Sequence, residues 1–355
     1  MLLPVAALHG CVSAARRVLH RTGVLASQRL PVQVIVVGNL VAGGAGKTPT
    51  VIALVQMLRR EGYRPGVVSR GYGRKGGEVM EVLTDSAAAS CGDEPLLIRR
   101  RTNVPVFVGS DRVGASRALL RRHSEVDVLV SDDGLQHLRL ERDVQVLVFD
   151  ERGAGNGWLL PAGPLREALP QATPPRTVVL YNAERPTTPL RGHLVHRRMR
   201  GAVALDGWWH GQEASPETLA SLSGREVVAA AGMALPDRFF RMLREAGLQV
   251  VALPLPDHFD FATLPWPPDA RDVVVTEKDA VKLDPARVAG TTRIWVAALD
   301  FAPTPAFDAE VLRLLAPPAA SGMPNADGNT TAHPSRLPDL QGSAAAPPAA
   351  DPRTP

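Results

Sequence analysis

The chain has 355 residues, 45% of them hydrophobic and 21% charged, and its 40 Lys and Arg outnumber its 36 Asp and Glu. This composition is typical of a globular protein of roughly two domains, and it excludes a collagen-like or wholly disordered chain. Two cysteines, Cys11 and Cys91, are too few for a disulfide framework or a Cys-rich zinc site, so we expect reduced thiols.

The first part of the chain carries only positive charge, because the first acidic residue is Glu61. Such a segment suits an anionic partner, which could be a nucleotide, a phospholipid surface or a nucleic acid. No stretch interleaves basic with aromatic residues in the way that single-stranded nucleic acids require. We therefore expect no nucleic-acid partner.

Residues 1–22 predict an amphipathic helix that associates with a membrane surface. The alternative is a helix packed on its own domain. The basic residues of segment 1–22 follow its apolar stretch, whereas those of a signal peptide precede it. The sequence has no apolar run of 18 or more residues, so it predicts no transmembrane helix. Counted from Pro4, one face holds Val5, Leu8, Val12, Ala15 and Leu19, and the other holds His9, Ser13, Arg16, Arg17 and His20.

Short apolar runs then alternate with helical patterns over residues 23–184. This alternation predicts an α/β domain with a parallel sheet covered on both faces. The expected strands are 32–37, 66–69, 79–83, 104–108, 126–131, 144–149 and 177–180, and the expected helices are 46–61, 93–101 and 111–122.

A stretch rich in Pro and Arg, residues 185–200, predicts a linker to a smaller α/β domain over residues 201–315. In that domain we expect strands at 227–231, 248–253 and 273–276, and a helix at 236–246. A further helix follows, which Thr276 could cap together with Asp279. Residues 316–355 are rich in Pro and Ala and lack Val, Ile and aromatic residues, so they predict a disordered tail.

The sharpest local signal is GNLVAGGAGKTP, residues 38–49, between the first strand and its helix. Small residues let backbone N–H groups approach phosphate oxygens, and the start of the helix adds its dipole. Lys47 would reach the outer phosphates, and the Thr48 hydroxyl would bind Mg²⁺. The generic motif has Gly where this chain has Val41. The expected nucleotide-binding residues are Asn39, Gly43, Gly44, Ala45, Gly46, Lys47, Thr48 and Pro49.

A phosphate loop needs a carboxylate nearby that orders the metal. Asp132 and Asp133 follow an apolar strand, and paired carboxylates at the end of a strand are placed to hold Mg²⁺ directly or through water. Asp150, at the end of the next strand, is a weaker candidate. The alternative for the pair is a turn that caps a helix. Together with the loop, these residues predict a site for a nucleoside triphosphate and Mg²⁺.

The acceptor of the phosphoryl group is less evident from the residues themselves. Asp93, in CGDEP, could be a general base or merely a helix cap. His258, in LPDHF, is a loop histidine that could equally be structural. The turn SRGYGR offers Arg70 and Tyr72 to an anionic group or solvent. PAGPLRE presents Arg166 and Glu167, to which spacing alone gives no role. The candidate substrate residues are Arg70, Tyr72, Arg166 and Glu167.

Taken in order, these segments resemble the tetraacyldisaccharide 4'-kinase family, the lipid A 4'-kinases of Gram-negative bacteria. The matching segments run from position 38 to 283 and are GNLVAGGAGKTP, SRGYGR, GDEP, SDDGLQH, LPAGPLRE, PDHFDF and TEKDAVKL. GDEP or PDHF alone is weak, but the ordered set is specific. The resemblance implies a P-loop NTPase-type kinase domain with a smaller α/β domain, at the cytoplasmic face of the inner membrane.

The resemblance also implies the reaction. The γ-phosphate of ATP would move to the 4'-hydroxyl of tetraacyldisaccharide 1-phosphate, giving the bis-phosphorylated lipid A precursor of lipopolysaccharide biosynthesis. Asp93 matches the catalytic carboxylate of the family and His258 its partner, while Asp132 and Asp133 match the acidic pair that orders the metal. The segment TEKDAVKL matches too, but we assign no chemical role to its Lys278.

A second hypothesis is a P-loop ATPase switch that cycles on and off a membrane. Its loop looks similar, and it could share the amphipathic helix. Such switches usually carry Lys immediately before the two glycines, where this chain has Ala42. The switch also leaves GDEP and PDHF unexplained.

Overall fold

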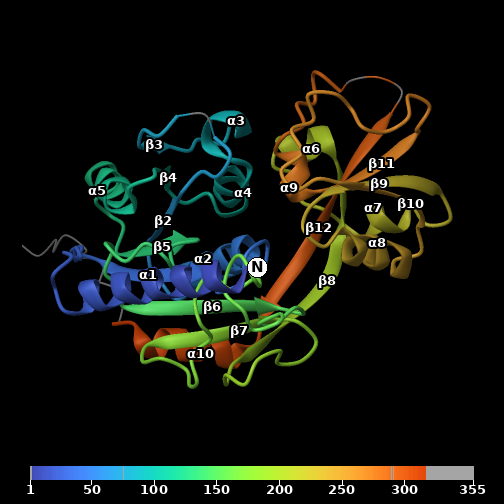
Figure 1. The fold of residues 1–355 in the computed structure, drawn as a ribbon. Coiled ribbons are helices and arrows are strands. Elements are labelled where there is room, and N and C mark those ends of the chain that lie inside the picture. The colour runs from blue at the N-terminus through green and yellow to red at the C-terminus, as the bar shows by residue number, and fades with distance from the viewer. Residues whose placement is uncertain (1, 75, 289, 291, 317–355) are drawn as a thin grey trace, which may run out of the picture. The chain divides into compact units, whose positions relative to one another are not determined.

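The computed structural model describes residues 2–74, 76–288, 290 and 292–316, and within them twelve strands form one sheet. The order is β10-β9-β11-β12-β8-β7-β6-β1-β5-β2-β4-β3. Figure 1 shows two groups of elements at the two ends of this sheet, which we call the first lobe and the second lobe. The predicted tail lies outside the described residues, apart from Ala316.

The first lobe confirms the predicted α/β fold with a mostly parallel sheet. Alternate residues of β1 enter opposite cores: Ile35 and Val37 join the core that includes α2 and α4, and Val34 and Val36 join that of α5. Helices therefore cover both faces. The elements are β1 (Gln33–Gly38), α2 (Lys47–Arg60), β2 (Pro65–Ser69), β3 (Met80–Glu81), α3 (Ala88–Cys91), α4 (Asp93–Thr102), β4 (Val106–Val108), α5 (Arg112–Arg122), β5 (Val128–Asp132), β6 (Val144–Asp150) and β7 (Thr177–Asn182).

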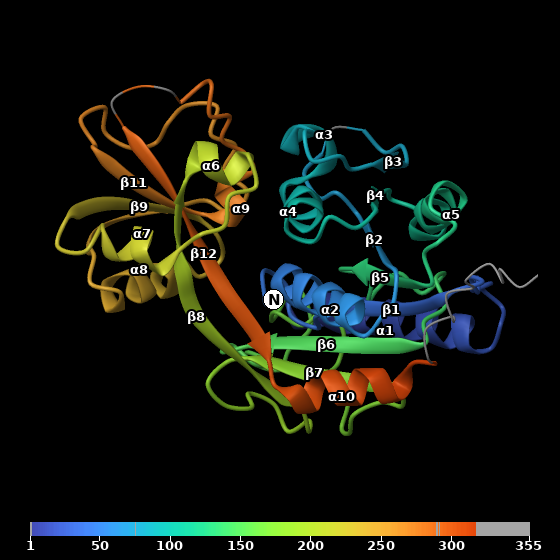
Figure 2. The ribbon, with the colours of Figure 1, turned by 180° about the vertical axis from the view of Figure 1, so that it is seen from behind.

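Two long antiparallel strands, β8 (His193–Ala204) and β12 (Arg293–Pro303), connect the lobes, as Figure 2 shows from behind. β8 starts inside the segment 185–200, which the sequence predicts as a linker. The basic residues of β8 did not indicate a strand. Their charged ends reach solvent or form ion pairs, while the backbone of β8 pairs with that of β12. Arg198, for example, pairs with Asp300 on β12 at 2.9 Å.

The second lobe repeats the β-α-β pattern on a smaller scale. It contains α6 (Leu205–Trp209), α7 (Pro216–Ala220), β9 (Glu226–Gly232), α8 (Pro236–Glu245), β10 (Gln249–Leu255), β11 (Asp272–Thr276) and α9 (Glu277–Ala280). The hydroxyl of Thr276 accepts a hydrogen bond from the Asp279 backbone N–H, which is the predicted cap. The last helix, α10 (Pro305–Leu314), returns to the first lobe, where Arg176 donates to the Leu314 carbonyl at 2.8 Å.

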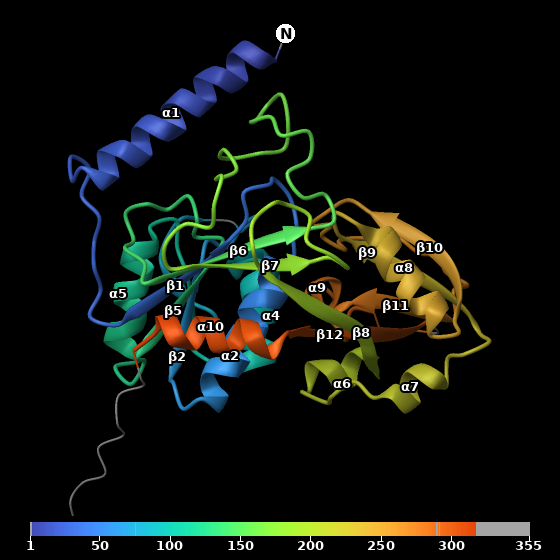
Figure 3. The same cartoon turned by 90° about the horizontal axis from the view of Figure 1, so that it is seen from below.

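The N-terminal helix α1 (Leu3–Arg21) presents its polar face to the rest of the chain. Arg17 forms an ion pair with Glu167 at 2.8 Å, and Gly10 lies against Leu159. The apolar face points away: the Leu8 side chain is 66% exposed and that of Val12 60%. Figure 3 shows this helix standing apart from the sheet. No helix among the described residues is long and apolar enough to cross a membrane.

Candidate active site

The phosphate loop follows β1 and closes onto the start of α2. Gly46, the residue before α2, has φ of +94°, in the left-handed region that favours glycine. A Cβ there would lie 2.3 Å from the side-chain nitrogen of Asn182, at the end of β7. Glycine is favoured at this position, because the conformation strains any other residue and a Cβ would displace the Asn182 amide.

Side-chain donors hold the carbonyl oxygens of the loop. Asn39 donates to Val41 and Gly43, and Asn182 donates to Ala45 at 3.0 Å. Arg152 donates to Ala42 at 3.3 Å and to Gly44 at 3.1 Å. The backbone N–H groups of residues 43–46 have no acceptor within the described part of the chain. The loop therefore offers these amides to an anion, and its carbonyl groups are held away from it.

The acidic pair lies at the end of β5, beside the phosphate loop, since Asp132 is in register with Val37 of β1. Asp132 is buried, and its Oδ2 accepts a hydrogen bond from the Ser69 hydroxyl at 3.0 Å. Its Oδ1 has no partner among the described residues. Burial raises the pKa of Asp132 to about 7, with help from the nearby carboxylates of Glu94 and Asp133.

These observations fit a Mg²⁺ site. A buried carboxylate with an unpartnered oxygen is costly unless a cation binds there. Within the described residues, no three His, Cys, Asp or Glu side chains form a metal cluster by themselves. Mg²⁺ is usually bound by one or two carboxylates together with substrate phosphates and water. Thr48, Asp132 and Asp133 are the side chains available.

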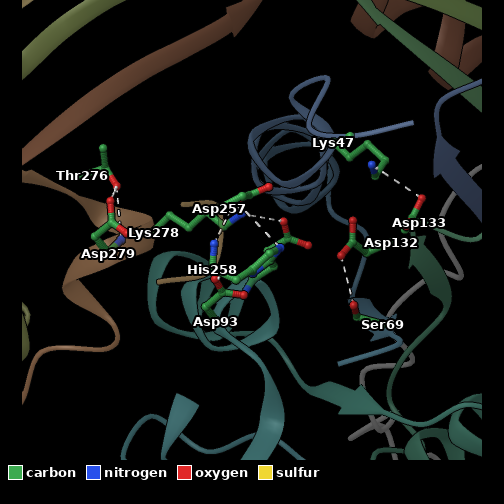
Figure 4. Close-up of polar contacts among 12 residues, drawn as sticks. Lys47, Ser69, Asp93, Asp132, Asp133, Asp257, His258, Thr276, Lys278 and Asp279 are labelled. Atoms are coloured by element: carbon green, nitrogen blue, oxygen red, sulfur yellow. Dashed lines mark hydrogen bonds and ion pairs between the residues drawn. The ribbon is translucent and has the colours of Figure 1, made fainter. Parts of the chain in front are cut away.

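Asp133 and Lys47 face each other across this site (Figure 4). The Lys47 ammonium lies 3.6 Å from Asp133 Oδ1 and 3.2 Å from the side-chain oxygen of Asn39. Asp133 also accepts from Arg166 at 3.2 Å and has a positive φ of 48°. A non-glycine residue in this region of the Ramachandran plot is unusual, and such residues gather at functional sites.

The structure brings Asp93 and His258 together, although they are 165 positions apart. Asp93 begins α4 in the first lobe, and His258 lies in the loop after β10 in the second. The imidazole Nδ1 is 2.9 Å from Asp93 Oδ2 (Figure 4). His258 has a positive φ of 60°, and its ring contacts Tyr72 with centroids 5.0 Å apart.

The protonation of this pair is set by its surroundings. Burial alone would raise the pKa of Asp93, but the hydrogen bond from His258 and the charges of Lys278 and Lys282 lower it below its ordinary value. The hydrogen bond to Asp93 raises the pKa of His258. The arrangement thus favours a carboxylate beside an imidazole that holds a proton.

The four predicted substrate residues fall in different places. Tyr72 is 62% exposed and lies on His258, and Arg70 is exposed at the end of β2. Arg166 contacts Asp133, as described. Glu167 accepts from Gln136 at 3.1 Å and pairs with Arg17 of α1, so it connects the site to the N-terminal helix.

A cleft of about 1320 Å³ opens beside Asp93 and His258. Tyr72, Asp93 and His258 line it, together with Trp209 and Gln212 of the second lobe. The phosphate loop, Arg70 and Arg166 do not line this cleft. Asp93 therefore borders a space large enough for a second ligand.

Sequence reasoning missed Arg152 and Asn182. Asn182 could have been found as a polar residue ending a buried strand next to β6. Arg152 had no such signal, because its role depends on a fork-shaped contact with Asp150 and on its reach to the loop. Asp150, the weaker metal candidate, accepts hydrogen bonds from Arg152.

Three comparisons with known proteins bear on this site. A family model described as "LpxK: Tetraacyldisaccharide-1-P 4'-kinase" matches residues 1–316. A tetraacyldisaccharide 4'-kinase of Methylibium petroleiphilum is 57% identical over 320 residues, which are 89% of each chain. One of Leptothrix cholodnii is 56% identical over 317 residues, covering 88% of this chain and 91% of the relative.

A solved structure is similar as well. It is a crystal structure of LpxK from Aquifex aeolicus, described as in complex with ATP. The two chains are 26% identical, and the TM-score is 0.72. The similarity covers 88% of this chain and 98% of the other.

Proposed function

The chain belongs to the tetraacyldisaccharide-1-phosphate 4'-kinase family, and we propose that its site transfers the γ-phosphate of ATP to the 4'-hydroxyl of that lipid. The product is the bis-phosphorylated lipid A precursor. The observation that carries this assignment is the Asp93–His258 hydrogen bond beside a phosphate loop. A nucleotide site alone would not need it.

The first lobe supplies the ATP site. The amides of residues 43–46 would bind phosphate oxygens, and Lys47 would neutralise the outer phosphates. Thr48, Asp132 and Asp133 would hold Mg²⁺, which stabilises the charge on the phosphates during transfer. With ATP and Mg²⁺ in place, Asp132 would be ionised despite its raised pKa.

Asp93 is the proposed general base. As the 4'-oxygen forms its bond to the γ-phosphorus and the bond to the β-phosphate oxygen breaks, the hydroxyl proton passes to the Asp93 carboxylate and ADP leaves. His258 donates its Nδ1–H to Oδ2, which orients the carboxylate. The backbone N–H of Glu94 donates to Oδ1 at 2.9 Å, so both oxygens are fixed.

The acceptor lipid would approach from the open side of this pair. Tyr72 lines the cleft beside the pair, and we assign it to the hydroxyls of the disaccharide phosphate. We assign Arg70 and Arg166, which lie outside this cleft, to the charges of the substrate. Glu167 holds Arg17 of α1, so the sugar site and the helix would be fixed relative to each other.

We assign α1 to the membrane surface, at the cytoplasmic face of the inner membrane. An exposed apolar face on a basic helix favours insertion at the boundary between headgroups and acyl chains. Vesicles of phosphatidylethanolamine and phosphatidylglycerol test this by co-sedimentation. Leu8→Glu with Val12→Glu should abolish binding, whereas Leu264→Glu, at a 43% exposed leucine of the second lobe, should not. Equal vesicle binding by the unaltered protein, the double variant of α1 and Leu264→Glu would contradict the assignment.

The ATPase switch is not favoured. The family match spans both lobes and includes GDEP and PDHF, which a switch leaves unexplained. A transfer assay separates the two functions: protein, Mg²⁺, γ-labelled ATP and tetraacyldisaccharide 1-phosphate are mixed in detergent micelles. Label should appear in the lipid, and Lys47→Met should remove it. Steady ATP hydrolysis without labelled lipid would instead support the switch.

A further inference from the structure

The segment TEKDAVKL, residues 276–283, has no part in the function proposed so far. It begins at the end of β11, continues through α9, and lies against α4 of the first lobe. Three of its side chains form ion pairs with α4: Glu277 with Arg101, Lys278 with Glu94, and Lys282 with Asp93.

Lys278 forms ion pairs with the residues that adjoin Asp93 and His258 in the sequence. Its ammonium lies 2.9 Å from the carboxylate of Asp257, which precedes His258. The same nitrogen lies 3.3 Å from the carboxylate of Glu94, which follows Asp93. One side chain therefore connects the loop that carries the imidazole with the helix that carries the carboxylate (Figure 4).

Lys282 reaches the carboxylate itself. Its ammonium is 4.0 Å from Asp93 Oδ2 and 2.8 Å from Asp279 Oδ1, and its side chain is only 7% exposed. Asp279 is fully buried and also accepts from the Thr276 hydroxyl and the Gly232 N–H. This network fixes Lys282, so its charge is held at a defined place next to Asp93.

The charge near Asp93 comes mainly from the second lobe. His258, Lys278 and Lys282 act on it from there, and Asp257 pairs with Lys278 and His258. On its own side are the Glu94 carboxylate and the Cys91 thiol, whose pKa burial raises to about 11 and which is therefore uncharged at neutral pH. The hydrogen bond from His258 also lowers the pKa of Asp93, but without the two ammonium groups the burial of this carboxylate would be less well compensated and its protonated form would gain weight.

We propose that Lys278 and Lys282 are positioning residues, which hold the Asp93–His258 pair together and supply the positive charge that keeps Asp93 ionised. This inference rests on the proposed role of Asp93 as the base. The base would then have its reactive charge state only while the second lobe contacts α4. The TEKDAVKL segment of the second lobe would thus supply the charges that Asp93, in the GDEP segment of the first lobe, needs as a base.

The test is the pH profile of kcat/KM for lipid phosphorylation, measured with the full chain. Activity rises with pH as the base loses its proton, so a higher pKa of Asp93 moves this acid limb to higher pH. Lys278→Met and Lys282→Met should each move it upward by about 1 pH unit, and Lys278→Arg should restore it. Arg101→Met is the matched control, because it breaks the ion pair with Glu277 about 12 Å farther along α4.

The outcomes separate cleanly. An acid limb that moves in both Met variants but not in Arg101→Met supports the proposal. If all three variants lose activity by the same factor at every pH, the lysines are merely structural and the proposal is wrong. If Lys282→Met fails to fold, as its melting temperature would reveal, Lys278→Met decides alone. No transfer by the unaltered protein would contradict the proposed function itself.

Discussion

The phosphate loop and the Asp93–His258 pair lie at the same edge of the sheet, but the chain builds them differently. The loop comes from consecutive residues of the first lobe, and its carbonyl groups are held by side chains at the ends of β1, β6 and β7. The pair exists only where the two lobes touch. If the proposed roles are right, ATP binding should depend mainly on one lobe, whereas transfer should depend on contact between both.

The largest expected effect comes from the pair. Asp93→Asn keeps the shape of the side chain but cannot accept the hydroxyl proton, so kcat for lipid phosphorylation should fall about 10²–10⁴-fold. The initial rate of label transfer from γ-labelled ATP measures this. Near-normal kcat in this variant would rule out Asp93 as the base.

The loop should respond in another way. Lys47→Met removes the charge next to the outer phosphates, and we expect a loss of about 10²–10³ in kcat/KM together with a higher KM for ATP. Steady-state kinetics at varied ATP concentrations give both constants. A fall in kcat without any change in KM for ATP would mean that this lysine serves transfer only.

The hydrogen bond within the pair should be visible in stability as well as activity. A double-mutant cycle with Asp93→Asn and His258→Gln should give a coupling energy of about 2 kcal/mol in the free energy of unfolding. Urea unfolding at a series of pH values measures it.

The pH dependence of that coupling follows from the two pKa directions. The lowered pKa of Asp93 gives a contribution that is present above about pH 4 and is lost as pH falls through the folded value. The raised pKa of His258 gives one that is present below about pH 6.5 and is lost as pH rises through its folded value. The coupling should therefore be largest between about pH 4 and 6.5. A coupling energy that stays constant from about pH 3 to about pH 9 would exclude an ionic pair.

The smallest effect is expected at Arg152. Lys in its place can still pair with the buried Asp150 but cannot donate to the Ala42 and Gly44 carbonyls at the same time. We expect Arg152→Lys to raise the KM for ATP about 3–10-fold with little change in kcat. Arg293→Lys, at an ion pair of the second lobe, is the control. An unchanged KM for ATP would show that the loop keeps its shape without this contact.

The same contrast explains how much of the molecule could be predicted from the sequence. The fold of the first lobe could be predicted, because its strands are continuous apolar runs and its phosphate-loop motif consists of consecutive residues. Strand β8 could not be predicted, because its basic side chains are not typical of a strand and its antiparallel partner, β12, lies about a hundred residues later in the chain. The roles of Lys278 and Lys282 were hidden for a similar reason: only the contact between lobes places their charges beside Asp93.

The most direct test of this account measures nucleotide binding and a single turnover of transfer on the same protein preparations. Asp93→Asn should bind ATP as tightly as the unaltered protein and transfer almost nothing in one turnover. Lys47→Met should lose both. If Asp93→Asn loses ATP binding to the same extent as Lys47→Met, the pair belongs to the nucleotide site, and the division of labour between the two lobes is wrong.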